Sequence, residues 1–187
     1  MITITQPQLE LEEFLKLPET KPASEFINGE ITQKVMPQGE HSRLQGKLGG
    51  AINQVTETDK IAYAFPELRC TFDGRSIVPD ISVFRWSRIP REPSGRIANR
   101  FTTYPDWCIE ILSPEQNLTR VLSKLLLCSR NGTELGWLIN PDEDGSVILV
   151  FPEQKIELYE GDTVLPVLDC LQLELTPNQI WGWLSFD

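Results

Sequence analysis

Apolar residues recur along the chain with two different periods, and each period predicts a different kind of element. Between residues 41 and 57 the positions Leu44, Leu48, Ile52 and Val55 lie three or four residues apart, which predicts a long helix with one apolar face. Shorter runs rich in β-branched and aromatic residues predict strands. The same criteria predict further helices at 8–17, 117–130 and 177–184, and strands at 61–72, 76–86, 106–112, 134–140, 147–151 and 155–160.

Turn residues divide the remaining sequence. Asn28-Gly29 splits residues 25–35 into a predicted hairpin, because Asn-Gly suits a type I′ turn. Asp73-Gly74 and Asp144-Gly145 are predicted to turn the chain between strands. The order of strands and helices predicts an α/β (α+β) fold, in which a mixed central sheet is flanked by helices, rather than a doubly wound parallel sheet. A length of 187 residues is typical of one domain, so we expect a single domain spanning 1–187.

The composition is that of an ordinary globular protein and favours a cytoplasmic location. Hydrophobic residues make up 40% of the chain, and no run approaches the roughly 18 apolar residues that a membrane-spanning helix needs. The four cysteines lie far apart without a C-x-x-C pair, so we interpret them as reduced core thiols: Cys70, Cys108, Cys128 and Cys170. The acidic N-terminal region lacks the basic and apolar pattern of a secretory leader. We expect no membrane association.

The charge distribution leaves room for a nucleic-acid partner. The net charge is −10, but the first 100 residues carry 13 basic and 13 acidic residues and are neutral. Seven arginines lie between Arg69 and Arg100, several of them in residues 87–101, a segment too long for a simple connection. Arginine forks bind phosphate. These arginines therefore either contact a DNA backbone or pair with nearby acids in a solvated loop.

Two acidic residues interrupt strongly apolar runs. Asp80 lies in the predicted strand 76–86, and Glu110 in the predicted strand 106–112. A buried charge without a partner costs several kcal/mol, and two neighbouring carboxylates repel each other unless a cation lies between them. Hard divalent cations take oxygen ligands, so the pair predicts a Mg²⁺ site in which Mn²⁺ would substitute. The alternative is that each acid pairs with an arginine, such as Arg69 or Arg85.

Lys124 is the third element of this candidate site. It lies in the predicted helix 117–130 among apolar neighbours. A lysine in that setting either extends its stem along the surface to reach solvent or points its ammonium at a buried acid. A short Ser-Pro turn joins the Glu110 strand to this helix, and this order of elements allows Lys124 to meet Glu110.

His41, the single histidine, begins the predicted helix at 41–57. The positive end of the helix dipole disfavours its cationic form. A structural role and a catalytic or substrate-contacting role at the rim of the site both stay open. Glu25, Glu30 and Glu40 are further candidates as auxiliary metal ligands.

Several segments together resemble a known family. They are 25–30 (EFINGE), 40–42 (EHS), 78–83 (VPDISV), 105–114 (PDWCIEILSP) and 136–141 (GWLINP). These segments resemble the Uma family of putative restriction endonucleases, a bacterial group within the PD-(D/E)xK nuclease superfamily. The resemblance extends over residues 10–170 and is most specific around Asp80 and Glu110.

The resemblance implies a restriction-endonuclease-like fold in a single PD-(D/E)xK-type domain, with Asp80 and Glu110 as metal ligands. The superfamily's lysine usually lies two residues after the second acid, where this chain has Leu112. In this family the lysine is displaced onto the following helix, and the matching position is Lys124. The expected activity is Mg²⁺-dependent hydrolysis of DNA phosphodiester bonds, with His41 as a fourth catalytic residue.

Two departures from the family pattern support an alternative. Arg120 stands where relatives often have an acid, and Asn140 stands where they have an aspartate. The alternative is a catalytically inactive nuclease-like scaffold that binds a partner or nucleic acid. We also expect a homo-oligomer, with a dimer as its simplest form. The C-terminal aromatics either form its interface or dock onto the core: Trp181, Trp183 and Phe186.

Overall fold

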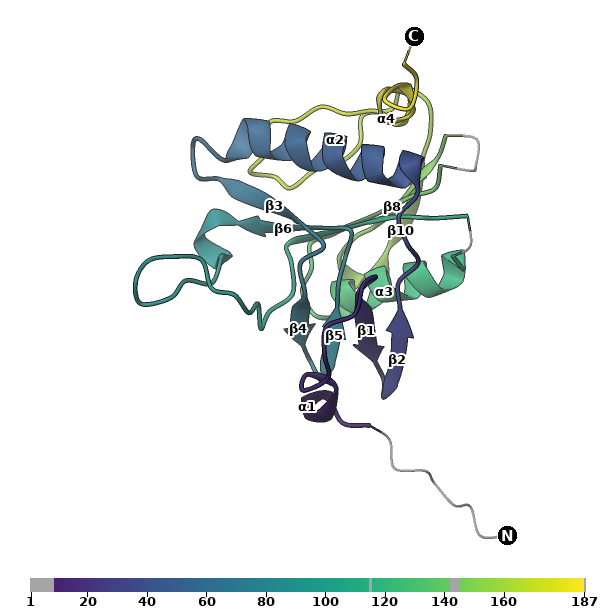
Figure 1. The fold of residues 1–187 in the computed structure, drawn as a ribbon. Coiled ribbons are helices and arrows are strands. Elements are labelled where there is room, and N and C mark those ends of the chain that lie inside the picture. Colours follow the sequence, from purple (N-terminus) through teal and green to yellow (C-terminus); the bar gives the residue numbers. More distant parts are fainter. Residues whose placement is uncertain (1–8, 115, 142–144, 187) are drawn as a thin grey trace, which may run out of the picture.

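The chain folds around two β-sheets, shown in the computed structural model of Figure 1. The structure describes residues 9–114, 116–141 and 145–186. Within these ranges the larger sheet has six strands in the order β10-β9-β8-β7-β6-β3, and the smaller has four in the order β2-β1-β5-β4. The larger sheet is mixed, because β7 and β8 run parallel while the other neighbours run antiparallel. This confirms the predicted mixed sheet.

The elements are short and follow one another closely. The strands are β1 (Ser24–Ile27), β2 (Glu30–Gln33), β3 (Ala62–Pro66), β4 (Cys70–Phe72), β5 (Arg75–Ile77), β6 (Ile81–Arg85), β7 (Trp107–Ile111), β8 (Leu135–Ile139), β9 (Val147–Val150) and β10 (Ile156–Tyr159). The helices are α1 (Leu11–Phe14), α2 (Gly39–Thr56), α3 (Leu118–Arg130) and α4 (Pro177–Gly182), with short 3-10 turns η1 (Trp86–Arg88) and η2 (Pro152–Gln154).

Helices α2 and α3 cover opposite faces of the six-stranded sheet, as Figure 1 shows. Side chains alternate across a strand. Accordingly Trp107 and Ile109 of β7 pack on the α2 side, whereas Cys108 packs on the α3 side. Glu110, two residues after Cys108, therefore points toward α3. The long predicted helices at 41–57 and 117–130 are confirmed as α2 and α3.

The predicted hairpin and one further turn are confirmed. Between β1 and β2, Asn28 and Gly29 have φ values of 53° and 83°, the left-handed region that a type I′ turn requires. Asp73 and Gly74 join β4 to β5 with φ values of 47° and 70°. Helix α1 is shorter than the predicted 8–17. Gln8, the first residue of that predicted helix, and Asp144, of the predicted Asp144-Gly145 turn, lie outside the described residues.

The structure divides each of the predicted strands 61–72 and 76–86 between the two sheets, so both predictions are wrong as single strands. β3 ends at Pro66, and the segment between β5 and β6 contains Pro79. Proline interrupts a ladder because it has no backbone N–H to donate. Asp80 therefore lies at the entrance to β6 rather than inside a strand.

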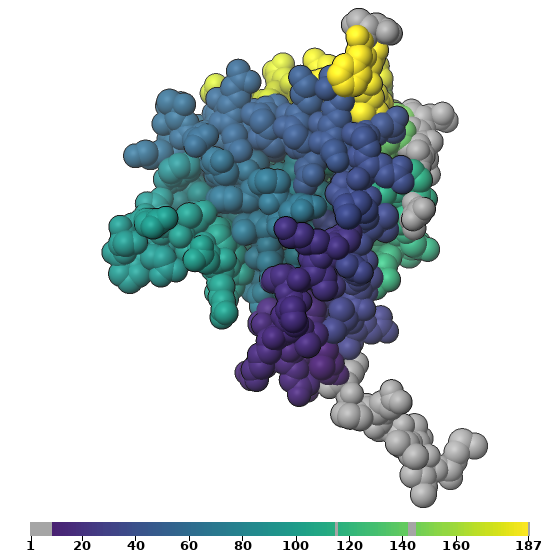
Figure 2. Space-filling model, in the orientation of Figure 1, coloured from purple at the N-terminus to yellow at the C-terminus, as the bar shows by residue number. Residues whose placement is uncertain are grey.

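Residues 87–101 form the predicted long loop, which projects from the body of the molecule in Figures 1 and 2. Two arginines near its start are held by acids. Arg85 binds Glu134 at 2.6 Å, and Arg88 pairs with Asp106. The expected pairing with acids is thus confirmed for these two. Within the described ranges the structure shows no ion pair for Arg91, Arg96 or Arg100.

The C-terminal aromatics have different environments. Trp181 and Trp183 are partly buried against the main core, whereas Phe186 is 82% exposed. The predicted homo-oligomer stays a prediction, as does the single domain. No helix among the described residues is long and apolar enough to cross a membrane. The cysteines are free thiols, three of them buried and Cys170 partly exposed.

Candidate metal and catalytic site

The register of β6 against β7 places the two predicted acids opposite each other. These strands run antiparallel, with Ile81 paired to Ile109. Continuing this register by one residue brings Asp80 opposite Glu110. The backbone confirms the approach, because Ile111 N donates a 2.8 Å hydrogen bond to Asp80 Oδ2. Both acids are 1% exposed. The sequence pattern therefore identified a real pair of buried carboxylates.

Asp80 is neutralised by a lysine rather than by an arginine. Lys34 Nζ lies 2.6 Å from Asp80 Oδ1 and donates a second hydrogen bond of 2.8 Å to Val78 O. The side chain of Lys34 is 6% exposed. Arg69 instead pairs with Glu19, and Arg85 pairs with Glu134. The alternative that each acid pairs with one of these arginines is therefore wrong.

Lys124 points into the site and joins two acids. Its Nζ lies 2.8 Å from Glu110 Oε1 and 2.8 Å from Glu25 Oε1. The same oxygen of Glu25 accepts a 2.8 Å hydrogen bond from Val78 N. Only 6% of the Lys124 side chain is exposed, so it does not extend to solvent. The expected meeting of Lys124 with Glu110 is confirmed, and Glu25 joins the cluster as a third acid.

Lys34 was missed by the sequence analysis, although the hairpin carries a signal for it. In the β1–β2 ladder Glu25 pairs with Thr32, so these two side chains lie on one face of the hairpin. Lys34 follows Thr32 by two residues, and its N–H extends the ladder to Ala23 O at 2.9 Å. The period of two therefore places Lys34 on the face of Glu25, beside the site.

Helix α2 supplies a neutral histidine behind Asp80. His41 and Gln45 lie one helical turn apart, and Gln45 Nε2 donates a 2.8 Å hydrogen bond to the backbone oxygen of Asp80. His41 Nε2 is 3.2 Å from Asp80 Oδ2. Burial lowers the pKa of His41, which keeps the imidazole neutral near pH 7. His41 is 5% exposed, so the expectation that it lies at the rim is wrong.

The other two candidate acids do not enter the cluster. Glu30 is exposed and lines a hollow beside the site, and Glu40 is exposed at the start of α2. The hollow lined by Glu40 also contains Leu184 and Phe186, on another part of the surface.

The charges of the cluster shift one another's protonation. Burial raises the pKa of Glu110 to about 8, although the ammonium of Lys124 opposes that rise. Burial lowers the pKa of Lys124, but attraction to Glu110 and Glu25 outweighs it and leaves that pKa well above its ordinary value. Burial also lowers the pKa of Lys34, but attraction to Asp80 outweighs it, and that pKa is raised as well. At neutral pH both lysines are charged, and Glu110 retains a proton.

The cluster opens to solvent between the β1–β2 hairpin and α3. A hollow of about 230 Å³ is lined there by Glu25, Lys34 and Lys124. A second hollow of about 480 Å³ shares Lys124 and Arg120 with the first and also contains Arg75 and Arg130, among others. We call this pair of hollows the hairpin cleft. Its basic lining suits a phosphate backbone.

The donors fit a hard divalent cation. Glu110 Oε1 is buried, and the Lys124 ammonium 2.8 Å away is its partner among the described residues, so a cation would take the place of that ammonium at this oxygen. No group of three or more His, Cys, Asp or Glu among those residues is arranged to hold an ion. Mg²⁺ commonly takes one or two carboxylates with waters and substrate oxygens. Asp80 and Glu110 meet that requirement once Lys34 releases Asp80 Oδ1.

The protonation of Glu110 is directly measurable. In protein labelled with ¹³C at the glutamate carboxyl carbon, the Glu110 resonance should titrate near pH 8. Lys124→Met removes the nearby positive charge that favours ionisation, so the pKa should rise further. Lys155→Met removes an exposed lysine that pairs with Glu157 and should leave the titration unchanged. A midpoint near the ordinary value of 4.5 would contradict this electrostatic account.

Comparison with known proteins supports the fold and shows the family. The family model described as Uma2, "Putative restriction endonuclease", matches residues 11–182. A crystal structure described as a putative nuclease belonging to DUF820 from Anabaena variabilis ATCC 29413 is 51% identical, with a TM-score of 0.92 over 95% of this chain and 99% of that chain. Comparison with curated proteins gives no match. The fold and these matches agree, and the chain belongs to the Uma2 family, described as putative restriction endonucleases.

Proposed function

We propose that this chain is a metal-dependent endonuclease that hydrolyses phosphodiester bonds in DNA. The observation that carries the proposal is the placement of Asp80 opposite Glu110, both buried, beside Lys124, which lines the hairpin cleft. The family description and the similar crystal structure, described as a putative nuclease, support a nucleic-acid substrate.

Asp80 and Glu110 would hold Mg²⁺, with Mn²⁺ as a substitute. When bound, such an ion polarises the scissile phosphate and lowers the pKa of an attacking water. Glu110 would lose its proton to serve as a ligand, because a carboxylate binds a cation in its ionised form. Glu25 holds Lys124 in place through the 2.8 Å contact, so its role is positioning.

The two lysines would act on the phosphate itself. Lys124 and Lys34 both line the hairpin cleft, and their ammonium groups are held against Glu110 and Asp80, the proposed metal ligands. A fixed positive charge at this position stabilises the negative charge that develops on the phosphate during hydrolysis. His41 is neutral and buried behind Asp80, so we assign it a positioning role toward that carboxylate.

The basic residues around the cleft would bind the DNA backbone. Arg75, Arg120 and Arg130 line it. Of the loop arginines, Arg85 and Arg88 are occupied by acids, which leaves the later arginines of residues 87–101 for phosphate contacts. The free thiols and the absence of a described membrane-spanning helix fit a cytoplasmic location, which we retain as part of the proposal.

An inactive scaffold is the second candidate. The 2.6 Å contact between Lys34 and Asp80 favours it, because an ammonium already neutralises one proposed ligand. In that case the lysines would replace the metal permanently, and the cleft would bind nucleic acid without cutting it.

Substitution of either acid tests the active-site assignment. Asp80→Asn and Glu110→Gln should each abolish Mg²⁺-dependent cleavage of plasmid DNA while circular dichroism shows that the fold is retained. The amides are preferred to alanine because they keep the side-chain volume and an oxygen that accepts a hydrogen bond from the paired lysine, although loss of the buried charge should lower the melting temperature. Asp59→Asn, at an exposed position, is the matched control and should retain activity. Full cleavage by either amide variant would refute the assignment.

Metal binding separates the nuclease from the scaffold. Calorimetric titration with Mg²⁺ should show binding that tightens as pH rises from 6 to 8, because the proton on Glu110 competes with the ion below its pKa of about 8. The affinity should rise about tenfold from pH 6 to 7 and about fivefold from pH 7 to 8, since the competition fades as the pH approaches this pKa. Asp80→Asn should abolish the signal. Absence of binding at millimolar Mg²⁺ across the whole range would favour the scaffold.

A further inference from the structure

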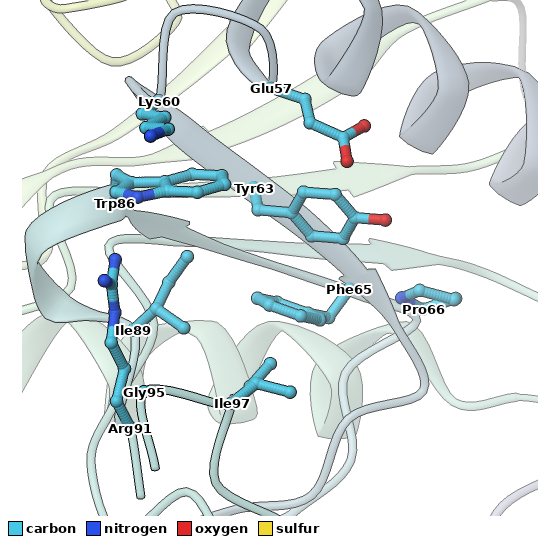
Figure 3. Close-up of a pocket in the computed structure, with 10 residues that line it drawn as sticks. All are labelled: Glu57, Lys60, Tyr63, Phe65, Pro66, Trp86, Ile89, Arg91, Gly95 and Ile97. Atoms are coloured by element: carbon cyan, nitrogen blue, oxygen red, sulfur yellow. The ribbon is translucent and has the colours of Figure 1, made fainter. Parts of the chain in front are cut away.

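Another hollow lies at the β3 edge of the six-stranded sheet, away from the hairpin cleft. It has a volume of about 530 Å³, within the range of ligand sites, and lies between the edge strand β3 and the 87–101 loop. Figure 3 shows Trp86 next to Tyr63 in that view, with Phe65 and Ile89 below them and Ile97 lower still. We call this hollow the β3 pocket.

The walls of the β3 pocket are fixed by the fold. Tyr63 and Phe65 lie on one face of β3, because Ala62 and Ala64, which alternate with them along the strand, point into the α2 core. The two rings are 4.7 Å apart at their centroids. Tyr63 and Phe65 are only partly buried, as is Trp86. Aromatic surface is thus presented to the hollow rather than enclosed in the core.

The loop that closes the other side is ordered by its own hydrogen bonds. Arg91 and Ile97 form an antiparallel bridge, and Ala98 N donates to Pro90 O at 2.9 Å. Ile97 is nevertheless 47% exposed and lines the pocket, so much of this apolar side chain is uncovered. The loop therefore presents apolar surface to the pocket instead of burying it.

Positive charges stand at the edges of this aromatic surface. Lys60 and Arg91 both line the pocket and are exposed. The Cζ atom of Arg91 lies 6.0 Å from the centre of the Trp86 ring. Aromatic rings flanked by cations are the combination that binds unpaired bases, with the rings stacking on the base and the cations contacting phosphate. Glu57, the one acid lining the pocket, can accept a hydrogen bond from a base amino group.

Strand β3 and the residue after it link the pocket to the candidate metal site. Pro66, at its inner end, pairs with Ile81, the residue after Asp80. The next residue, Glu67, donates its N–H to Asp80 O at 3.1 Å. Tyr63 lies three residues before Pro66, roughly 10 Å along the strand. A nucleotide near one held at Asp80 could therefore reach the pocket.

We propose that the β3 pocket receives an unpaired nucleobase from a single-stranded segment of the DNA substrate, stacked on Trp86 and Tyr63 with its phosphates beside Lys60 and Arg91. This inference rests on the proposed function and narrows it, since it makes DNA with an unpaired region the preferred substrate. A fully paired duplex keeps its bases stacked inside and offers none to the pocket.

Binding of two matched probes tests the proposal. Fluorescence anisotropy, in EDTA to prevent metal-dependent cleavage, would compare a fluorescein-labelled oligothymidylate with a duplex of equal length. Trp86→Ala should weaken binding of the single strand roughly 10- to 100-fold, the range for loss of a stacking ring, and should leave duplex affinity unchanged. Trp86→Phe keeps a ring and should recover most of the affinity. Phe186→Ala, which removes an 82% exposed ring elsewhere, is the matched control.

A second variant covers the case in which Trp86→Ala fails to fold. Ile97→Glu changes an exposed side chain and places a carboxylate in the pocket, so it should repel the single strand selectively. Unchanged single-strand affinity in the folded variants would overturn the proposal, as would equal loss for both probes. A change from dimer to monomer on sedimentation, with DNA affinity intact, would show a protein interface instead and would also overturn it.

The outcomes distinguish the pocket from the active site. If the pocket variants bind single strand like the parent protein while Mg²⁺-dependent cleavage persists, the pocket assignment fails and the proposed nuclease stands. If the parent protein binds neither probe and cleaves no DNA, the proposed function fails and the pocket assignment fails with it.

Discussion

The pairing of β6 with β7 fixes the charged centre on which the rest of the site depends. Ile81 and Val83 of β6 face the α2 core together with Trp107 and Ile109 of β7. A slip of one residue would turn these apolar side chains to the other face of the sheet, so the hydrophobic pattern specifies the register strongly. The same register sets Asp80 against Glu110 in the interior. Two carboxylates are thereby forced together where water cannot separate them, and the surrounding fold has to supply positive charge.

That charge comes from two elements that lie far apart in the sequence. Lys34 follows the β1–β2 hairpin of the small sheet, and Lys124 belongs to α3. The ion pairs therefore tie the small sheet, the large sheet and a helix to one point. Because an unpaired charge in this position costs several kcal/mol, both lysines are required in the absence of a cation. A divalent ion supplies the same compensation from solution, which would free Lys34 to act on substrate.

The sequence predicted the periodic parts of this structure and the identity of the central acids. Asp80 and Glu110 were identifiable because charge inside an apolar run is rare, and Lys124 because its helical neighbours are apolar. Helices α2 and α3 followed from their regular spacing. The breaks that separate β3 from β4 and β5 from β6 were missed, since each run is rich in strand-forming residues on both sides of the break and the prolines Pro66 and Pro79 were not taken as its signal.

Contacts between distant segments could not be predicted from local pattern. An arginine was the alternative to a metal ion as the partner of Asp80, but Arg69 and Arg85 are taken by Glu19 and Glu134, and Lys34 reaches Asp80 from the hairpin. Burial of His41 behind Asp80 depends on how α2 packs on the sheet, which cannot be predicted from the sequence of α2 alone. The β3 pocket likewise exists only because a loop of residues 87–101 folds back over the edge strand.

The central claim is that Asp80 and Glu110 share one divalent cation. A crystal of this protein soaked in Mn²⁺, with anomalous data collected above the manganese absorption edge, tests it most directly. For a shared metal site we expect a single anomalous peak in contact with both carboxylates, with Lys34 Nζ withdrawn from Asp80 Oδ1. An empty site at high Mn²⁺, with Lys34 still bound to Asp80 and Lys124 still bound to Glu110, would contradict it.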